Sequence, residues 1–128
     1  MSIFVLSFVL FISVVVSQDQ LTRFTKAKEE FLPSAETSII LAWPLTAKAS
    51  NQSIIAINVF IRNHNNAPLP NKKVTLQSNL GQVKEAEVIT DKAGKATFNL
   101  SSDSPGIAEV VATADGVQVK QKVSIKFE

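Results

Sequence analysis

The chain contains no cysteine, which excludes disulfide bridges, thiolate catalysis and sulfur-ligated metal sites. The redox compartment stays open, because an exported domain with a sufficient core folds without bridges. The single histidine, His64, stands in an asparagine-rich stretch with no second ligand type nearby. We therefore expect His64 to have a structural or solvent-exposed role, and we predict no metal site and no cofactor.

A strong charge of one sign is also missing. The net charge is only +2, and the lysines are scattered among acidic residues. This pattern lacks the clustered positive charge of a nucleic-acid-binding protein. The sequence also has no G-x-S-x-G motif, P-loop or dinucleotide fingerprint. The chain is therefore predicted to be neither an enzyme nor the receptor of a small-molecule substrate.

The acidic residues do not change this prediction. Glu85 and Glu87 would share one face of a short strand, and paired carboxylates do occur in glycosidases. No aromatic sugar platform accompanies them, so a solvated pair is expected. Asp91, Asp103 and Asp115 all fall in turn sequences, and no alternating D-x-D cluster supplies enough oxygens for calcium.

One long apolar run is present, at residues 3–16, and it carries no charge. It is long for a signal-peptide core and short for a relaxed membrane span, which needs about 20 residues. No Lys or Arg precedes it, so the charged start of a cleavable signal is absent. We predict a transmembrane anchor over residues 1–17, with a signal cleaved before Gln18 as the alternative.

The segment after this run has apolar residues near the helical period until Pro33 ends the pattern. Residues 18–35 are therefore predicted to be a helical stalk or linker. From residue 36 to residue 128 the period changes to two, which predicts a domain made of strands. The expected strands cover residues 37–49 with a break at Pro44, 53–62, 73–78, 84–90, 95–100, 107–114 and 117–127, with a loop at 101–106.

About seven such strands, separated by turns and without a helix between them, predict an all-β sandwich. Pro44 breaks the first apolar pattern, as suits an edge strand that changes its partner. Ile54 and Phe60 fall on the second face of the longest strand, where they would meet the N-terminal strand or a partner. The residues expected to face the core are Ile55, Ile57, Val59, Ile61, Val74, Leu76, Ala96, Phe98, Leu100, Val119, Val123, Ile125 and Phe127.

Several residues have assigned roles outside the core. Asp91 and Gly94 are predicted to form a turn, with the Asp91 side chain accepting backbone hydrogen bonds and Gly94 at positive φ. Asp115 and Gly116 form the strongest short hairpin signal. Trp43 and Phe60 are the best candidates for an exposed aromatic contact, but core packing is the favoured expectation for each. A row of lysines on the last strand, which would guard the sheet edge, comprises Lys120, Lys122 and Lys126.

Three stretches resemble the bacterial immunoglobulin-like repeats of intimin and invasin, known as Big-1 domains. They are residues 65–78 (NNAPLPNKKVTLQS), 90–102 (TDKAGKATFNLSS) and 104–117 (SPGIAEVVATADGV). Transthyretin-like sandwiches share the first two motifs, but the G-x-A-x-V-x-A strand favours the intimin and invasin type. The matching positions are Pro68, Pro70, Val74, Thr90, Asp91, Gly94, Ala96, Gly106, Ala108, Val110 and Ala112.

The resemblance implies an Ig-like β-sandwich, preceded here by one N-terminal hydrophobic helix. It also implies extracytoplasmic exposure with structural or adhesion duty. We therefore expect a membrane-anchored, non-catalytic module that contacts another surface protein or a cell-envelope component. The alternative is a secreted or periplasmic binding domain for carbohydrate or cell wall. A pilin-like subunit is a third interpretation, weakened by the lack of a prepilin leader.

Overall fold

The computed structural model describes residues 30–128, so the predicted anchor and hydrophobic helix lie outside the described residues. Residues Pro33–Glu128 form one compact unit in which every regular element is a strand. The strands are β1 (Ile39–Trp43), β2 (Thr46–Ala47), β3 (Ser50–Phe60), β4 (Lys73–Ser78), β5 (Gln82–Val83), β6 (Val88–Ile89), β7 (Lys95–Ser102), β8 (Gly106–Ala114), β9 (Val117–Gln118) and β10 (Val123–Phe127).

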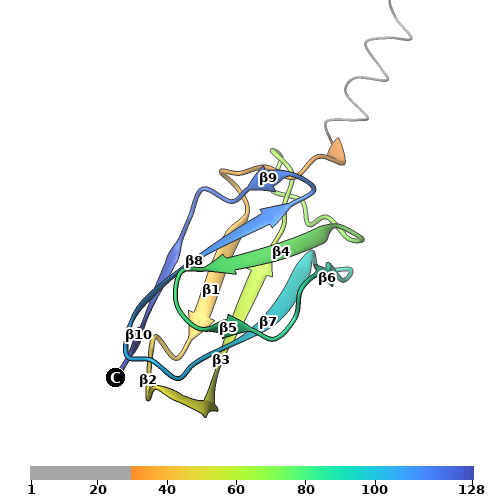
Figure 1. Ribbon diagram of the computed structural model, residues 1–128. Coiled ribbons are helices and arrows are strands. Elements are labelled where there is room, and N and C mark those ends of the chain that lie inside the picture. The colour runs from red at the N-terminus through yellow and green to blue at the C-terminus, as the bar shows by residue number, and fades with distance from the viewer. Residues whose placement is uncertain (1–29) are drawn as a thin grey trace, which may run out of the picture. The chain divides into compact units, whose positions relative to one another are not determined.

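These strands form two packed sheets (Figure 1). One sheet has the order β1-β3-β7-β5, and the other has the order β2-β10-β8-β4-β6 with β9 paired to β8. All pairs are antiparallel except β2 with β10, which is parallel. Residues Pro33–Glu128 thus form an all-β, Ig-like sandwich, as predicted, although four of the ten strands in this unit have only two residues.

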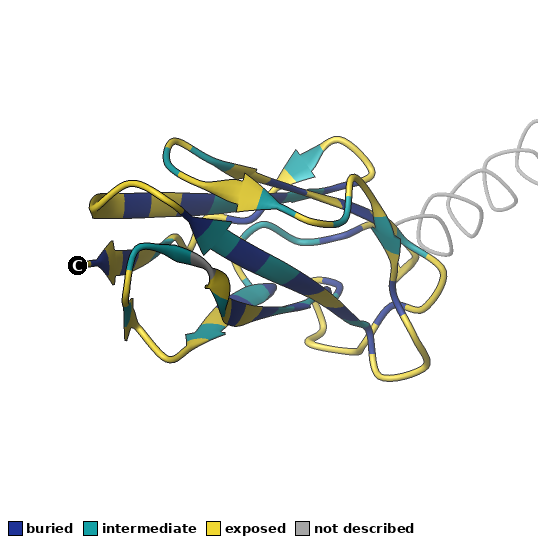
Figure 2. Ribbon diagram, turned by 60° about the horizontal axis from the view of Figure 1, so that its bottom comes forward, coloured by how far each residue is buried: buried dark blue, intermediate teal, exposed yellow. Residues whose placement is uncertain are grey.

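Buried and exposed residues alternate along the longer strands (Figure 2). Every residue predicted to face the core is fully or nearly buried except Val123, which packs partly buried against the core. Phe98 and Phe127 are among the largest buried side chains. Burying one large aliphatic or aromatic side chain contributes roughly 1.5–3 kcal/mol, so this core supplies the main driving force for the fold.

The chain changes sheets at Pro44, as predicted. β1 pairs with β3 in one sheet, while β2 pairs with β10 in the other. Pro44 has no amide hydrogen to donate, so the ladder with β3 ends there. The bond between Trp43 and Pro44 is cis. Beyond it, the Leu45 carbonyl accepts a hydrogen bond from the Lys126 amide of β10 at 2.9 Å.

The predicted strands differ in extent from the observed ones, most of all at residues 84–90 and 117–127. Residues 84–90 form a strand only at β6, because the chain crosses between the sheets from β5 to β6 in this segment. Residues 117–127 divide into β9 and β10. The break occurs because the Lys120 amide donates to the Ala35 carbonyl at 2.9 Å instead of to a neighbouring strand. The loop predicted at 101–106 begins later, since Ser101 and Ser102 belong to β7.

Candidate contact surface

Asp91 and Gly94 lie in the turn that precedes β7. The Asp91 carboxylate oxygen Oδ1 accepts hydrogen bonds from the amides of Ala93 at 2.9 Å and Lys95 at 3.0 Å. Gly94 has φ of +72°, and a Cβ at this position would lie 2.5 Å from the Ile61 carbonyl oxygen. Asp91 and Gly94 therefore shape the backbone of this turn.

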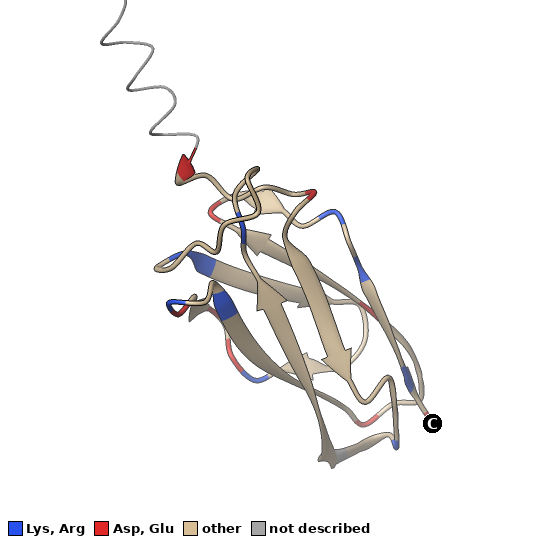
Figure 3. Ribbon diagram, turned by 180° about the vertical axis from the view of Figure 1, so that it is seen from behind, with Lys and Arg blue, Asp and Glu red and all other residues tan. Residues whose placement is uncertain are grey.

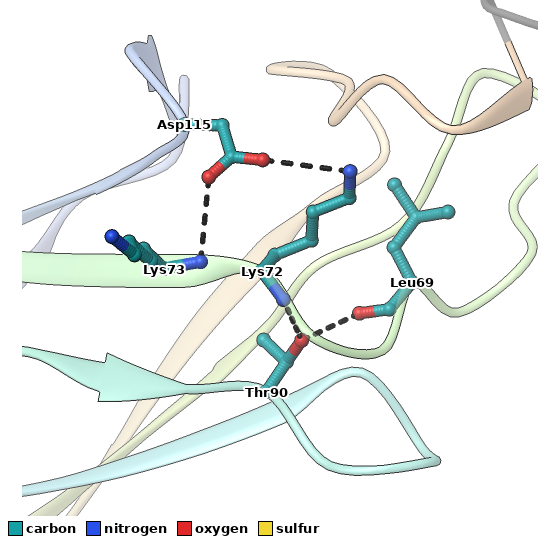
Figure 4. Close-up of polar contacts among 5 residues, drawn as sticks. All are labelled: Leu69, Lys72, Lys73, Thr90 and Asp115. Atoms are coloured by element: carbon teal, nitrogen blue, oxygen red, sulfur yellow. Dashed lines mark hydrogen bonds and ion pairs between the residues drawn. The ribbon is translucent and has the colours of Figure 1, made fainter.

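Asp115 and Gly116 connect β8 to β9, with φ of +47° and +82°. The Asp115 carboxylate accepts a hydrogen bond from the Lys73 amide and forms an ion pair with Lys72, each at 3.4 Å (Figure 4). An ion pair that is partly exposed contributes little stability by itself. Its geometry nevertheless ties the hairpin to the start of β4.

Thr90 lies beside this hairpin and is a buried polar residue. Its hydroxyl donates to the Leu69 carbonyl at 2.7 Å and accepts from the Lys72 amide at 2.9 Å (Figure 4). The side chain is only 3% exposed. Thr90 thus satisfies two backbone groups of the proline-containing loop and fixes that loop against β6.

Glu85 and Glu87 do not share a strand face, because neither lies in a strand. Both carboxylate oxygens of Glu85 accept hydrogen bonds from Asn99, at 2.8 Å from the backbone amide and 2.6 Å from the side chain. Desolvation raises the pKa of Glu85, but these hydrogen bonds, with a bond to its own amide and the charge of Lys84, outweigh it and lower that pKa overall. Glu85 therefore holds the crossing segment against β7, while Glu87 is exposed.

His64 is exposed in the loop before β4. Within residues 30–128, no three acidic or histidine side chains gather in a way that could hold a metal ion. One cleft of about 360 Å³ includes Ile54, Lys84 and Asn99 in its lining, at the β5 side of the four-stranded sheet.

The four-stranded sheet has an apolar outer face over β1 and β3. Ile40 and Ala42 face the core, so Ile39, Leu41 and Trp43 face outward. On β3, the residues between the buried isoleucines and valine are Ile54, Ala56, Asn58 and Phe60. We define the apolar outer face as Ile39, Leu41, Trp43, Ile54, Ala56 and Phe60.

Trp43 is the most exposed of these side chains, at 79%, followed by Ile54 at 58% and Leu41 at 50%. The favoured expectation from the sequence, that Trp43 packs in the core, is therefore wrong. Phe60 is half-buried beside Ile39. Large apolar side chains exposed next to one another are uncommon on a monomeric surface and are typical of interaction sites.

The register of the strands sets the edges of this surface. Trp43, Ala56 and Asn99 form one row across β1, β3 and β7. In the next row, the Thr97 hydroxyl donates to the Asn58 side-chain oxygen at 2.8 Å. The outward side chains are thus apolar on β1 and largely so on β3, but polar on β7. Neither β1 nor β3 contains a charged residue, as Figure 3 shows.

Comparison with known proteins agrees with this architecture. Residues 42–128, more than half of the chain, match the family model for the bacterial Ig-like domain (group 1). The chain belongs to this family. The resemblance of its three motifs to Big-1 domains is thereby confirmed, and the domain described above is a Big-1 domain.

The named relatives include intimin and invasin. The chain is 35% identical to intimin of Citrobacter freundii over 78 residues, which cover 61% of this chain but only 8% of that intimin. A 282-residue intimin fragment, solved with the translocated intimin receptor, has a TM-score of 0.65 and 29% identity, covering 75% of this chain and 33% of the fragment. Invasin, described as an integrin-binding protein, has a TM-score of 0.67 and 25% identity over 74% of this chain and 19% of invasin.

Sequence reasoning found only part of the apolar outer face. The alternation along β3 placed Ile54 and Phe60 on the second face. The run IILAW of β1 is apolar at every position, so it gives no sign of which residues are exposed. The pairing of Glu85 with Asn99 joins residues 14 positions apart, and no motif signals it.

Proposed function

We propose that this Big-1 domain is a non-catalytic adhesion or protein-interaction module, held at a membrane and exposed outside the cytoplasm. The observation that carries the proposal is the apolar outer face, where Trp43, Leu41 and Ile54 are half or more exposed. Exposed aromatic side chains in an apolar patch with a polar rim are typical of the centre of a protein interface.

The family supports this function, and the site offers no competing chemistry. Intimin has been solved in complex with its translocated receptor, and invasin is described as an integrin-binding protein. The chain spans a small part of each, so their receptors are not carried over. The carboxylates of Asp91, Asp115 and Glu85 accept hydrogen bonds within the fold, and His64 and Glu87 lie exposed.

Membrane anchoring is supported by the sequence of residues 3–16. We propose an anchor at residues 1–17, a stalk at 18–35 and the Big-1 domain at 36–128. The part of the chain that the structure describes contains no helix with the length and apolar character needed to cross a membrane. The alternative is a secreted or periplasmic form, released before Gln18, that binds carbohydrate or cell wall.

Two measurements on producing cells test the location. Mass spectrometry of the native protein should find peptides from residues 1–17, whereas an N-terminus at Gln18 would replace the anchor with the secreted alternative. Protease added to intact cells should remove the Big-1 domain. Full protection from the protease, with cleavage only after lysis, would contradict exposure outside the cytoplasm.

Photocrosslinking tests the contact surface in the full chain. A photoreactive phenylalanine analogue replaces Trp43 in one variant and Ile107 in a matched control. Ile107 is 61% exposed and lies on the other sheet, in β8. Adducts from position 43 that are absent from position 107 would support the proposal, and mass spectrometry would distinguish a protein adduct from a glycan. Equal labelling at both positions, or none, would contradict it.

A further inference from the structure

The open edges of the two sheets differ greatly in length. The four-stranded sheet ends at β1 and β5, and the other sheet ends at β2 and β6. Three of these edge strands have two residues each, but β1 has five. Very short edge strands are one way in which proteins prevent pairing with other chains. Among residues 30–128, β1 is therefore the one outer strand long enough to act as a template.

β1 also lacks the chemical features that block pairing. Its sequence, IILAW, has no charge, glycine or proline, and Pro44 stands only after its last residue. By contrast, β2 pairs with the last two residues of β10. Lys126 lies within β10, and Lys120 and Lys122 come just before it. The backbone amide and carbonyl groups on the open side of β1 need hydrogen-bond partners, and a second extended strand matches their spacing.

The sequence of β1 suits pairing with a second copy of itself. In an antiparallel pair, opposite residues must face the same side of the sheet. A twofold axis at Leu41 meets this requirement and pairs all five residues, whereas axes at Ile40 or Ala42 pair only three. Leu41 then lies opposite Leu41 of the second copy, and Ile39 lies opposite its Trp43. Because β1 is uncharged, no like charges meet across the pair.

We propose that two copies of this chain associate through β1, which joins their four-stranded sheets into one continuous sheet. The proposal rests on the proposed function and names the partner of the same contact surface. The pairing extends the apolar outer face across the twofold axis and places Ile39 of the second copy beside Trp43. A closed twofold contact of this kind is the commonest arrangement in homo-oligomers.

The geometry also fixes the orientation of the two copies. The chain enters the sandwich at the end where β1 begins, since the Ser34 amide bonds to the Arg62 carbonyl at 2.8 Å just after β3 ends. Antiparallel pairing of β1 places these entry points at opposite ends of the joined sheet. This orientation suits contact between chains anchored on two cell surfaces that face each other. One five-residue pair is smaller than a standard stable interface of about 1,600 Å², so many parallel contacts would be needed for adhesion.

Single cysteines test the register, because the natural chain has none. The full chain carrying Leu41→Cys is displayed on cells and treated with a mild oxidant. Residues opposite each other in an antiparallel pair have Cα atoms about 4.5–5.5 Å apart, within the range for a disulfide. We expect a disulfide-linked dimer. Trp43→Cys alone should give none, because position 43 of one copy lies about 13 Å from position 43 of the other along the strands.

Mixing completes the test. Cells carrying Ile39→Cys and cells carrying Trp43→Cys should yield a linked dimer only when the two populations are combined. Ile107→Cys, exposed on the other sheet, measures random collision. Dimers from positions 41, 43 and 107 in equal amounts, or none from position 41, would overturn the proposal. If position 41 gives no dimer while the photoreactive group at 43 still labels another protein, the contact surface stands and the second copy is excluded as its partner.

A charge on the edge provides an independent variant. Leu41→Lys places a cation on the open edge without touching the core, since the side chain of Leu41 is half exposed. We expect the variant to remain folded by circular dichroism and to lose cell-to-cell aggregation. Ile107→Lys is the matched control and should aggregate as the parent does. Loss of aggregation in both variants, or in neither, would contradict pairing through β1.

Discussion

Replacement of Thr90 by valine tests how the proline-containing loop is held in place. Valine keeps the shape of threonine and removes the hydroxyl, which bonds to the Leu69 carbonyl at 2.7 Å and to the Lys72 amide at 2.9 Å. Both backbone groups lose this partner in a site where the side chain is 3% exposed. Each lost hydrogen bond contributes about 1 kcal/mol, and a buried group left unpaired costs about 1–3 kcal/mol. We therefore expect a loss of about 3 kcal/mol in the free energy of unfolding.

Urea denaturation of the full chain in nonionic detergent, followed by far-ultraviolet circular dichroism, measures this loss. With a slope of about 2 kcal/mol per molar urea, the midpoint should fall by about 1.5 M. Thr97→Val is the matched control, because its hydrogen bond to Asn58 is exposed. Water replaces that bond, so the change should stay within about 0.5 kcal/mol. Equal shifts in the two variants, or no shift in Thr90→Val, would refute the assigned role of Thr90.

Three further predictions concern other parts of the domain. Since the pKa of Glu85 is lowered from its ordinary value of 4.5, the stabilisation from its carboxylate is present above this value and is lost as the pH falls through the folded-state pKa. The free energy of unfolding, measured from pH 6 down to well below about pH 4, should therefore decline less in Glu85→Gln than in the parent. Parallel curves of this free energy against pH would contradict the prediction. Gly94→Ala should destabilise the chain by more than about 1–2 kcal/mol, the cost of a positive φ for a residue with a Cβ, because the new Cβ would also crowd neighbouring atoms. The loss should also exceed that of Gly116→Ala, which has no atom within 4 Å of a new Cβ. Equal midpoints of the two variants in thermal unfolding would count against this prediction. The fluorescence of Trp43, the one tryptophan of the chain, should be red-shifted and readily quenched by acrylamide in the folded monomer, and a shielded signal would disprove its exposure.

The period-two pattern was most informative where a strand is buried on one side only. In β3 and β7 the alternation assigned each core residue to the correct face, because a strand turns successive side chains to opposite sides. The turn at Asp91 and Gly94 and the hairpin at Asp115 and Gly116 were also visible, since both depend on short-range backbone geometry. These features are local, and neighbouring residues suffice to specify them.

The errors occurred where the chain leaves one sheet for the other. Residues 84–87 alternate like a strand, yet they cross between β5 and β6, and Glu85 bonds to Asn99. Lys120 likewise bonds to Ala35 and interrupts what appeared to be one long final strand. Each of these bonds joins segments distant in sequence, so no local pattern could reveal it.

The Big-1 fold of residues 36–128, with its core residues and its turns, could be predicted from the amino-acid sequence, because burial on one face of a strand and positive φ in a turn each restrict the residue types allowed. Which apolar residues stay outside the core could not be predicted in this way. β1 is apolar at every position, and it is the pairing of one edge with β3 that leaves Trp43 and Leu41 exposed beside an open edge. Exposure of a uniformly apolar strand depends on which elements pack against it, and that is a property of the assembled fold.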